Sequence, residues 1–241
     1  MIDWLLKPKD QPLTVEIGSQ LVPLVIRRTA NARRMTMRLA PDGSEIRVTL
    51  PQWGRSAEAL AFARSKASWL AAQLAALPEP ARPTDGGDVL FRGQSLIITH
   101  DPARSRRVVI DGDRLHVGGP AESLPARLTR WLQGEARALL ATDLDHYCLH
   151  AAKPVPKLLM SSAQRRWGSC APDGTIRLNW RLVMAPDFVR RSVVAHEVTH
   201  LVHFDHSPRF HAFLDQLYEG DIRAANRWLK KHGRGLYLPF G

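Results

Sequence analysis

Five of the ten histidines in this chain lie in one stretch, VVAHEVTHLVHFDHSPRFH, which runs from Val193 to His211. The stretch contains the pattern HEVTH, which begins at His196 and ends at His200. Positions i and i+4 of an α-helix lie on one face, so two imidazoles at this spacing can bind the same metal ion. Glu197 can reach a water molecule at that ion without binding the ion itself. These residues therefore predict a zinc site that performs hydrolysis, with Glu197 as general base.

A catalytic zinc needs a third protein ligand, and a single straight helix does not supply it. His203 lies seven residues after His196, which places it about 10 Å along the helix axis, too far for both to reach one ion. Pro208 fits the first position of a new helix with Ser207 as its N-cap, so we expect the HExxH helix to end near residue 204 or 205. His206 then lies in the connection and is the predicted third ligand.

Several neighbouring residues have alternative roles. Glu219 is the rival third ligand, because some HExxH enzymes take a glutamate from a later helix. His203 and His211 are expected around the site or at the surface. Cys170 is either a fourth ligand or a plain buried thiol. Asp205 either hydrogen bonds a ligand imidazole or caps a helix.

The histidines are expected on a helix that is apolar over most of its circumference, FVRRSVVAHEVTHLVHF, residues 188–204. Such a helix is usually buried, and its polar residues then need partners. Upstream, residues 123–152 have the apolar stripe of a long amphipathic helix. Between these helices, PKLLMSS, AQRRWGSC and TIRLNWRL predict short strands, with a turn at residues 171–174.

The first half of the chain is rich in strand patterns. LVPLVIRR, RMTMRLA and EIRVTLP precede residue 52, and the turn PDG at residues 41–43 joins the last two into an expected hairpin. A helix is predicted over about residues 56–77, with Ser56 as its N-cap. Two further strand segments follow, DVLFRGQSLIITH and RRVVIDGDRLHVGG, the second with a turn at residues 111–113. No internal repeat is evident.

Together these patterns predict an α+β fold in two parts. Residues 1–118 would form a β-rich N-terminal domain with one helix. Residues 119–241 would form a mainly helical domain that carries the HExxH helix and a small antiparallel sheet. The boundary is placed at residues 118–120, where strand patterns give way to helical ones.

The chain is strongly basic, with 34 Lys and Arg against 23 Asp and Glu and a net charge of +11. Such a charge attracts polyanions, so a basic surface that binds nucleic acid or nucleotides is considered, although the Arg-Arg pairs are scattered. No apolar run approaches the roughly 18 residues of a membrane span. The N-terminal residues lack the features of a signal peptide, and two cysteines suit a reducing compartment. A cytoplasmic location without membrane contact is therefore expected, and the oligomeric state is not predicted.

Three segments together resemble a known family: RRWGSC, IRLNWRLVMAP and VVAHEVTHLVHFDHSPRF. They are similar to the YgjP-like metallopeptidases, also called the domain-of-unknown-function 45 family, relatives of WLM and SprT-like zincins. The resemblance covers most of the chain and implies a zincin-like catalytic domain over residues 119–241. It also implies zinc ligands at His196, His200 and His206 and a catalytic acid/base at Glu197. TIRLNWRL would be the strand beside the active-site cleft, with which an extended peptide pairs through its backbone.

Three functions are considered on this basis. The first is a zinc-dependent metallopeptidase that cleaves peptide bonds in a peptide or protein substrate. The second is a metal-dependent hydrolase of nucleotides or other phosphate esters, which the basic charge favours. It lacks a P-loop or a two-metal carboxylate pattern. The third is a nucleic-acid-associated protease whose β-rich N-terminal part binds a polyanion.

The residues expected to contact substrate are Arg165, Arg166, Trp167 and Asn179. Trp167 has the alternative role of a buried anchor for a hairpin, and Asn179 that of ending a strand. The candidates for stabilising the oxyanion are Arg165, Arg166, Tyr218 and Tyr237, and the sequence does not choose among them.

Overall fold

The computed structural model describes residues 13–76 and 83–240 of the chain. Contacts group these residues into two compact units, 13–76 and 83–240. The boundary predicted at residues 118–120 falls inside the second unit. The reason is that the sheet of residues 88–118 shares one hydrophobic core with the helix that follows it.

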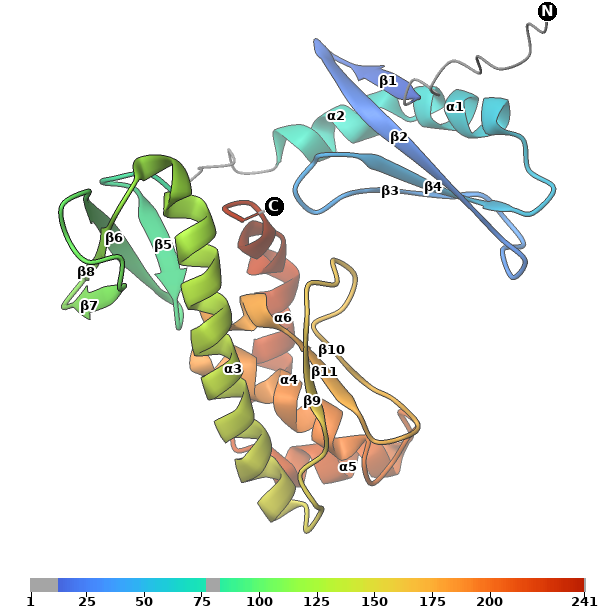
Figure 1. Cartoon of the computed structure of the whole chain (residues 1–241). Coiled ribbons are helices and arrows are strands. Elements are labelled where there is room, and N and C mark those ends of the chain that lie inside the picture. The colour runs from blue at the N-terminus through green and yellow to red at the C-terminus, as the bar shows by residue number, and fades with distance from the viewer. Residues whose placement is uncertain (1–12, 77–82, 241) are drawn as a thin grey trace, which may run out of the picture. The chain divides into compact units, whose positions relative to one another are not determined.

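A four-stranded sheet forms the N-terminal unit together with two short helices (Figure 1). Its order is β1-β2-β4-β3, in which β2 and β4 are parallel and the outer pairs are antiparallel. The hairpin predicted around residues 41–43 is confirmed by the antiparallel pairing of β3 with β4. The strands are β1 (Thr14–Ile17), β2 (Gln20–Thr29), β3 (Thr36–Leu39) and β4 (Ile46–Pro51).

The two helices, α1 (Ser56–Ser65) and α2 (Ala67–Ala75), pack against the apolar side chains of this sheet. Because side chains alternate between the two faces of a strand, every second residue of the central strands is buried there. The buried residues include Val22, Leu24, Ile46, Val48 and Leu50 from the sheet and Ala59, Ala63 and Leu70 from the helices.

The structure differs in two respects from the single helix predicted over residues 56–77. The helix is divided at Lys66, and its N-cap is Arg55, whose backbone N–H donates to the Glu58 carboxylate. The Ser56 hydroxyl instead accepts a hydrogen bond from Arg28 on β2. The predicted end at residue 77 lies outside the described residues.

The second unit begins with another four-stranded sheet, whose order β5-β6-β8-β7 and strand pairings repeat those of the first. The repeat is one of topology: the two segments share few residues apart from an Arg-Arg pair shortly before the third strand. Sequence inspection therefore misses it. The strands are β5 (Asp88–Phe91), β6 (Gln94–Asp101), β7 (Val109–Asp111) and β8 (Arg114–Gly118).

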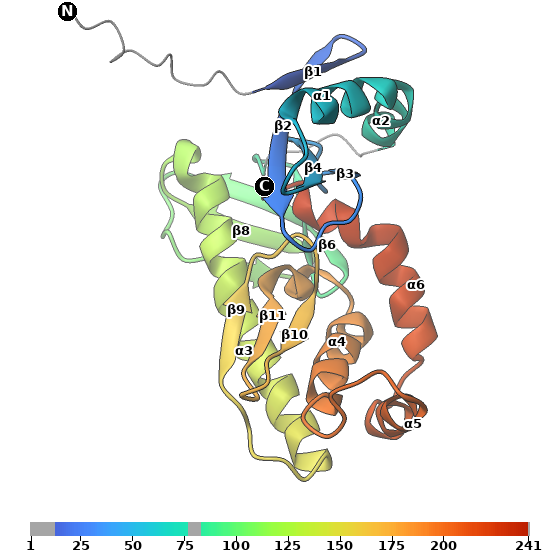
Figure 2. The same ribbon diagram turned by 90° about the vertical axis from the view of Figure 1, so that its right-hand side faces the viewer.

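The rest of this unit is built around α4 (Asp187–Thr199), as Figure 2 shows. The 27-residue α3 (Leu124–His150) packs along α4, preceded by a 3-10 turn, η1 (Ala121–Ser123). A small sheet contacts α4 on one side, and two helices contact it on the other, α5 (Pro208–Leu217) and α6 (Ile222–His232). A last 3-10 turn, η3 (Gly233–Tyr237), follows α6.

The small sheet has the order β10-β11-β9, so β10 is an edge strand. It is mixed and not antiparallel as predicted, because β11 pairs antiparallel with β10 and parallel with β9. The predicted strand TIRLNWRL ends at Asn179, where the chain turns into η2 (Trp180–Met184). The three strands are β9 (Leu158–Ser161), β10 (Gly168–Cys170) and β11 (Ile176–Asn179).

A buried ion-pair network fixes α4 against α3. The Arg190 guanidinium, 3% exposed, donates to Asp143 on α3 at 2.7 Å and to Asp187 at 2.5 Å. A buried charge is stable only when it is paired in this way. No helix in the two described ranges combines the length and apolar character that crossing a membrane requires.

Candidate metal centre

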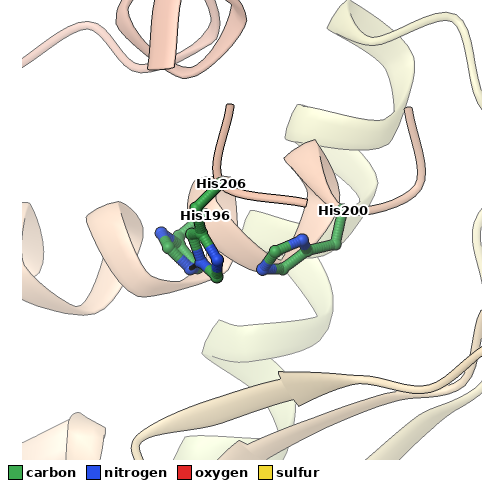
Figure 3. A group of neighbouring side chains, drawn as sticks. All are labelled: His196, His200 and His206. Atoms are coloured by element: carbon green, nitrogen blue, oxygen red, sulfur yellow. Dashed lines mark hydrogen bonds between the residues drawn. The ribbon is translucent and has the colours of Figure 1, made fainter. Parts of the chain in front are cut away.

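Three histidines converge at the C-terminal end of α4 (Figure 3). His196 lies on the last turn of α4, His200 is its C-cap residue, and His206 lies in the connection to α5. One ring nitrogen from each lies within 4.8 Å of one from each of the others. The structure therefore brings together the three residues that the sequence singled out as candidate ligands.

The spacing of these nitrogens fits a single tetrahedral ion. His206 Nε2 lies 3.3 Å from His196 Nε2. Two nitrogens bound to one tetrahedral zinc, each at about 2.0–2.1 Å, would be about 3.3 Å apart. Three neutral imidazoles are also a donor set that suits zinc better than magnesium or calcium, which prefer oxygen ligands.

The local sequence explains why His206 returns to the end of α4. The helix ends at Thr199, earlier than predicted, because the next residues form tighter turns with Leu201 N–H bonded to Val198 and Val202 N–H bonded to Thr199. Hydrogen bonds of this i to i+3 type commonly close a helix. The predicted N-cap of α5 is confirmed, since the Ser207 hydroxyl accepts the Phe210 N–H.

Phe210 supports all three imidazoles, a role that the sequence did not reveal. Its ring centre lies 4.9 Å from that of His196, 4.7 Å from that of His200 and 4.8 Å from that of His206. The side chain is fully buried. Phe210 therefore restricts the orientation of each ring from one side, as the residues around metal ligands commonly do.

Hydrogen bonding and burial prepare two of the histidines for binding. His200 Nδ1 lies 3.2 Å from the His203 carbonyl oxygen, which leaves Nε2 for an ion. Burial lowers the pKa of His200, and burial together with the neighbouring histidines lowers the pKa of His196 to about 4. Both imidazoles are therefore neutral at pH 7, the state in which they bind metal.

Glu197 lies on α4 beside these histidines and is 6% exposed. Burial raises the pKa of its carboxyl group to about 7, against the opposing effects of the Arg166 charge and a backbone hydrogen bond with Cys170. Strand β10 passes so close that a methyl group on Gly168 would lie 2.4 Å from Glu197 Oε1. Only glycine at this position leaves the carboxylate in place.

A cavity of about 200 Å³ adjoins Glu197 and His196. Trp167 and Gly168 line one wall, and residues of α4 and α6 line the rest. The strand next to this cavity is thus β10, whereas the family resemblance implied β11, the central strand of the sheet. Trp167 fits both roles considered for it, since it lines the cavity and its ring lies 5.4 Å from that of Tyr237.

The other residues expected to contact substrate differ in position. Arg165 and Arg166 are exposed, and the charge of Arg166 acts on Glu197. Asn179 does not fit the prediction, because its side chain has no exposed surface. Its amide nitrogen donates to Ala163 O at 2.7 Å, and its amide oxygen accepts the Arg181 N–H at 3.1 Å. Asn179 therefore ends β11, which was its alternative role.

The tyrosines proposed for oxyanion stabilisation hydrogen bond elsewhere. The Tyr218 hydroxyl donates to Phe188 O at 2.7 Å. The Tyr237 hydroxyl donates to Ala163 O at 3.1 Å and accepts from Asn179 at 3.2 Å. Both side chains are buried. Of the four candidates for oxyanion stabilisation, Arg165 and Arg166 are the two with exposed side chains.

Among the described residues, the histidine group includes neither of the alternative ligands, Glu219 and Cys170. Glu219 accepts hydrogen bonds from Arg191 at 2.6 Å and from the Tyr147 hydroxyl at 2.7 Å. Cys170 is half-buried, with its thiol 3.6 Å from Ala171 O. The Asp205 carboxylate accepts the Ser207 N–H at 3.2 Å and caps neither helix, since the C-cap of α4 is His200 and the N-cap of α5 is Ser207.

Comparison with known proteins identifies one family. A family model described as YgjP-like, metallopeptidase domain, matches residues 33–232. This match confirms the resemblance noted in the sequence and spans most of both units. A search of curated proteins and a search of solved structures found no match.

Proposed function

Because this chain belongs to the YgjP-like metallopeptidase family, we propose that it is a zinc-dependent peptidase. His196, His200 and His206 would hold one zinc ion, and Glu197 would act as the general acid and base. The substrate would be a peptide or protein, cleaved by attack of water on a peptide carbonyl.

One observation carries most of the proposal. Three ring nitrogens from different parts of the α4–α5 segment lie within 4.8 Å of one another, and the residue beside the first of them is a buried carboxyl group next to a cavity. A group of histidines with a purely structural role would need neither the carboxyl group nor the open space. The donors, the base and the space for substrate are the parts that metal-assisted hydrolysis requires.

When bound, zinc would supply Lewis acidity that polarises the substrate carbonyl and lowers the pKa of water. Glu197 would accept the proton that water loses on attack and then donate it to the leaving amine. Its pKa of about 7 belongs to the protein without a cation, and a nearby positive ion would lower it. Burial beside Gly168 keeps the carboxyl group in one position through both proton transfers.

Two elements would position the substrate. The edge strand β10 offers a backbone with which an extended peptide pairs, and this would place the peptide next to Glu197. Arg166 lies near enough to act on Glu197 electrostatically, so its guanidinium is the candidate that best fits oxyanion stabilisation.

The same arginine favours a second candidate function. Arg165 and Arg166 are exposed beside the site, and guanidinium groups bind phosphate oxygens in bidentate pairs. A hydrolase of nucleotides or phosphate esters would use these residues to bind its anionic substrate. This function predicts nucleotide turnover that depends on Arg166, with no peptide cleavage.

Metal analysis and a hydrolysis screen distinguish the two functions. Purified protein is analysed for bound metal, loaded with zinc and incubated with peptide and nucleotide libraries, with Glu197→Gln as the blank. The peptidase proposal predicts about one zinc per chain and peptide cleavage that Glu197→Gln removes. Zinc-loaded protein that turns over nucleotides but no peptide would establish the second function instead.

A further inference from the structure

The cavity beside Glu197 lies on one side of the candidate metal centre. His196 and Glu197 line it, but His200 and His206 do not. It continues toward the N-terminus of α4, past Val193 and Ser192, and is closed on the far side by α6. A group that enters it therefore lies beside the general base and not among the three imidazoles.

Four of the nine described residues that line the cavity have large apolar side chains, and Trp167 among them is firmly held. Trp167 packs against Tyr237 with ring centres 5.4 Å apart. A Cβ at Gly233 would lie 3.0 Å from Trp167 Cζ2, so the indole is also confined from that direction. Val193 and, from α6, Ile222 and Leu229 supply the remaining apolar surface.

Apart from His196 and Glu197, the polar side chains that line the cavity are Ser192 and Asn226, and both are uncharged. The Ser192 hydroxyl donates to Val189 O at 2.8 Å, within its own helix. Asn226 lies on the exposed surface of α6 between Ile222 and Leu229. Among the described residues that line the cavity, none is Lys, Arg or Asp.

From this geometry, and resting on the proposed peptidase function, we infer that the cavity receives one uncharged apolar side chain of the substrate, adjacent to the cleaved bond. The volume of about 200 Å³ is smaller than the roughly 300–1,000 Å³ of pockets that enclose a whole small molecule. One side chain fits such a space, whereas a nucleotide does not. A charged side chain would lose hydration there, and none of the α6 residues that line the cavity carries a charge to pair with it.

The selectivity is measured with a series of peptides that differ only at the two positions flanking the cleaved bond. At one of these positions, Leu or Met should exceed Ala in kcat/KM by about 10- to 100-fold, because each buried methylene contributes to discrimination. Asp at that position should be poorer still. The other flanking position should show weaker dependence.

Two variants assign that selectivity to this cavity. Leu229→Ala enlarges it and should raise the rate for Phe or Trp relative to Leu by about tenfold. Asn226→Lys adds a cation and should raise the rate for Glu relative to Leu, since the new charge pairs with the substrate carboxylate. Gln216→Lys is the matched control, because it adds the same positive charge at an exposed position on α5 and should leave the profile unaltered.

A binding measurement separates this inference from the activity itself. Addition of a Leu-containing peptide to metal-free protein should move the NMR signal of the Trp167 indole N–H, while the Asp-containing peptide should not. Equal rates for Leu, Ala and Asp peptides, or variants that leave the profile unchanged, would overturn the inference and leave the peptidase intact. If zinc-loaded protein cleaves no peptide, the proposed function fails. If, in addition, the Leu-containing peptide does not shift the NMR signal of Trp167, the assignment of the cavity as a side-chain site fails too.

Discussion

Gly168 on β10 lies directly against the carboxylate of Glu197 on α4. A Cβ added to Gly168 would approach Glu197 Oε1 to 2.4 Å and Cγ to 2.6 Å, both well inside contact distance. The carboxyl group is thus held between its own helix and a strand backbone, and a side chain on that strand would move it. The position of the candidate base depends on the absence of one methyl group.

Gly168→Ala should therefore reduce peptide hydrolysis and leave metal binding largely intact. A displacement of about 1 Å of a catalytic group can lower a rate by about 100-fold. The atoms nearest to the new methyl group belong to Glu197 and not to the three candidate ligands, so zinc content should stay near that of the wild type. The readouts are kcat/KM and metal content. Ser169→Ala on the same strand is the control, and full activity in Gly168→Ala would contradict the positional role.

Phe210→Leu should weaken zinc binding by about 10- to 100-fold, the range for residues that support metal ligands. Its ring contacts all three imidazoles, so a smaller side chain leaves each of them freer to rotate. The leucine variant is preferred because Phe→Ala in a core costs about 3–5 kcal/mol of stability. Affinity is measured by competition with a chelator. Phe213→Leu is the control, since Phe213 contacts the ring of His203, and equal affinities in the two variants would contradict the prediction.

The identity of the third ligand is tested by a pair of substitutions. His206→Ala should lower zinc affinity by more than about 100-fold, beyond the effect of removing a supporting residue. Glu219→Gln should leave zinc affinity unchanged, because Glu219 binds Arg191 and Tyr147 instead. Both affinities are measured by isothermal titration calorimetry. The reverse pattern would make Glu219 the ligand.

Asp187 should stabilise the fold in a pH-dependent way. Its hydrogen bond with Arg92, aided by Arg190, holds the carboxyl pKa below its usual value. A folded-state pKa below the unfolded value of about 3.9 contributes stability at higher pH, which is lost as pH falls through the folded-state pKa. Because 36% of the Asp187 side chain is exposed, the contribution should be about 1 kcal/mol.

Urea unfolding at pH 7 and pH 3 measures this contribution. Asp187→Asn should be less stable than the wild type at pH 7, and the difference should shrink at pH 3. Asp215→Asn, at an exposed position on α5, serves as the control. A difference that is equal at both values of pH would show that the charge of Asp187 is not responsible.

Local chemistry made much of the histidine group predictable. The i, i+4 spacing places His196 and His200 one turn apart, and Ser207 with Pro208 starts α5 where the capping rules expect it. His206 follows from these two facts, since the chain must turn back between the helices. The early end of α4 was not predictable, because the sequence remains apolar beyond Thr199 while the backbone changes to tighter turns.

What sequence reasoning missed depends on contacts between distant segments. In the sequence, Phe210 is one apolar residue among many. Its contact with the rings of His196, His200 and His206 becomes evident only in the folded structure. Gly168 is one residue of a predicted strand segment, and its importance comes from the approach of β10 to Glu197. Asn179, Tyr218 and Tyr237 have hydrogen-bond partners far along the chain. Their burial therefore argues against substrate contact by Asn179 and against oxyanion stabilisation by the two tyrosines.

In the fold, too, local features were predictable from the sequence and contacts between distant segments were not. Alternating patterns predicted the β3–β4 hairpin correctly, because that pairing is local. The repeated order of the two four-stranded sheets and the parallel pairing of β9 with β11 arise from non-local pairing, which no short pattern specifies. The boundary between the units was misplaced for a related reason: the β5–β8 sheet packs on α3, a contact that composition does not reveal.

The location of bound zinc tests the central claim most directly. Crystals of the zinc-loaded protein, measured at the zinc absorption edge, should show one anomalous peak among the three candidate ligands. We predict nitrogen atoms of His196, His200 and His206 at about 2.0–2.1 Å from it. A peak elsewhere in the chain, or one from which His206 is absent, would contradict the account.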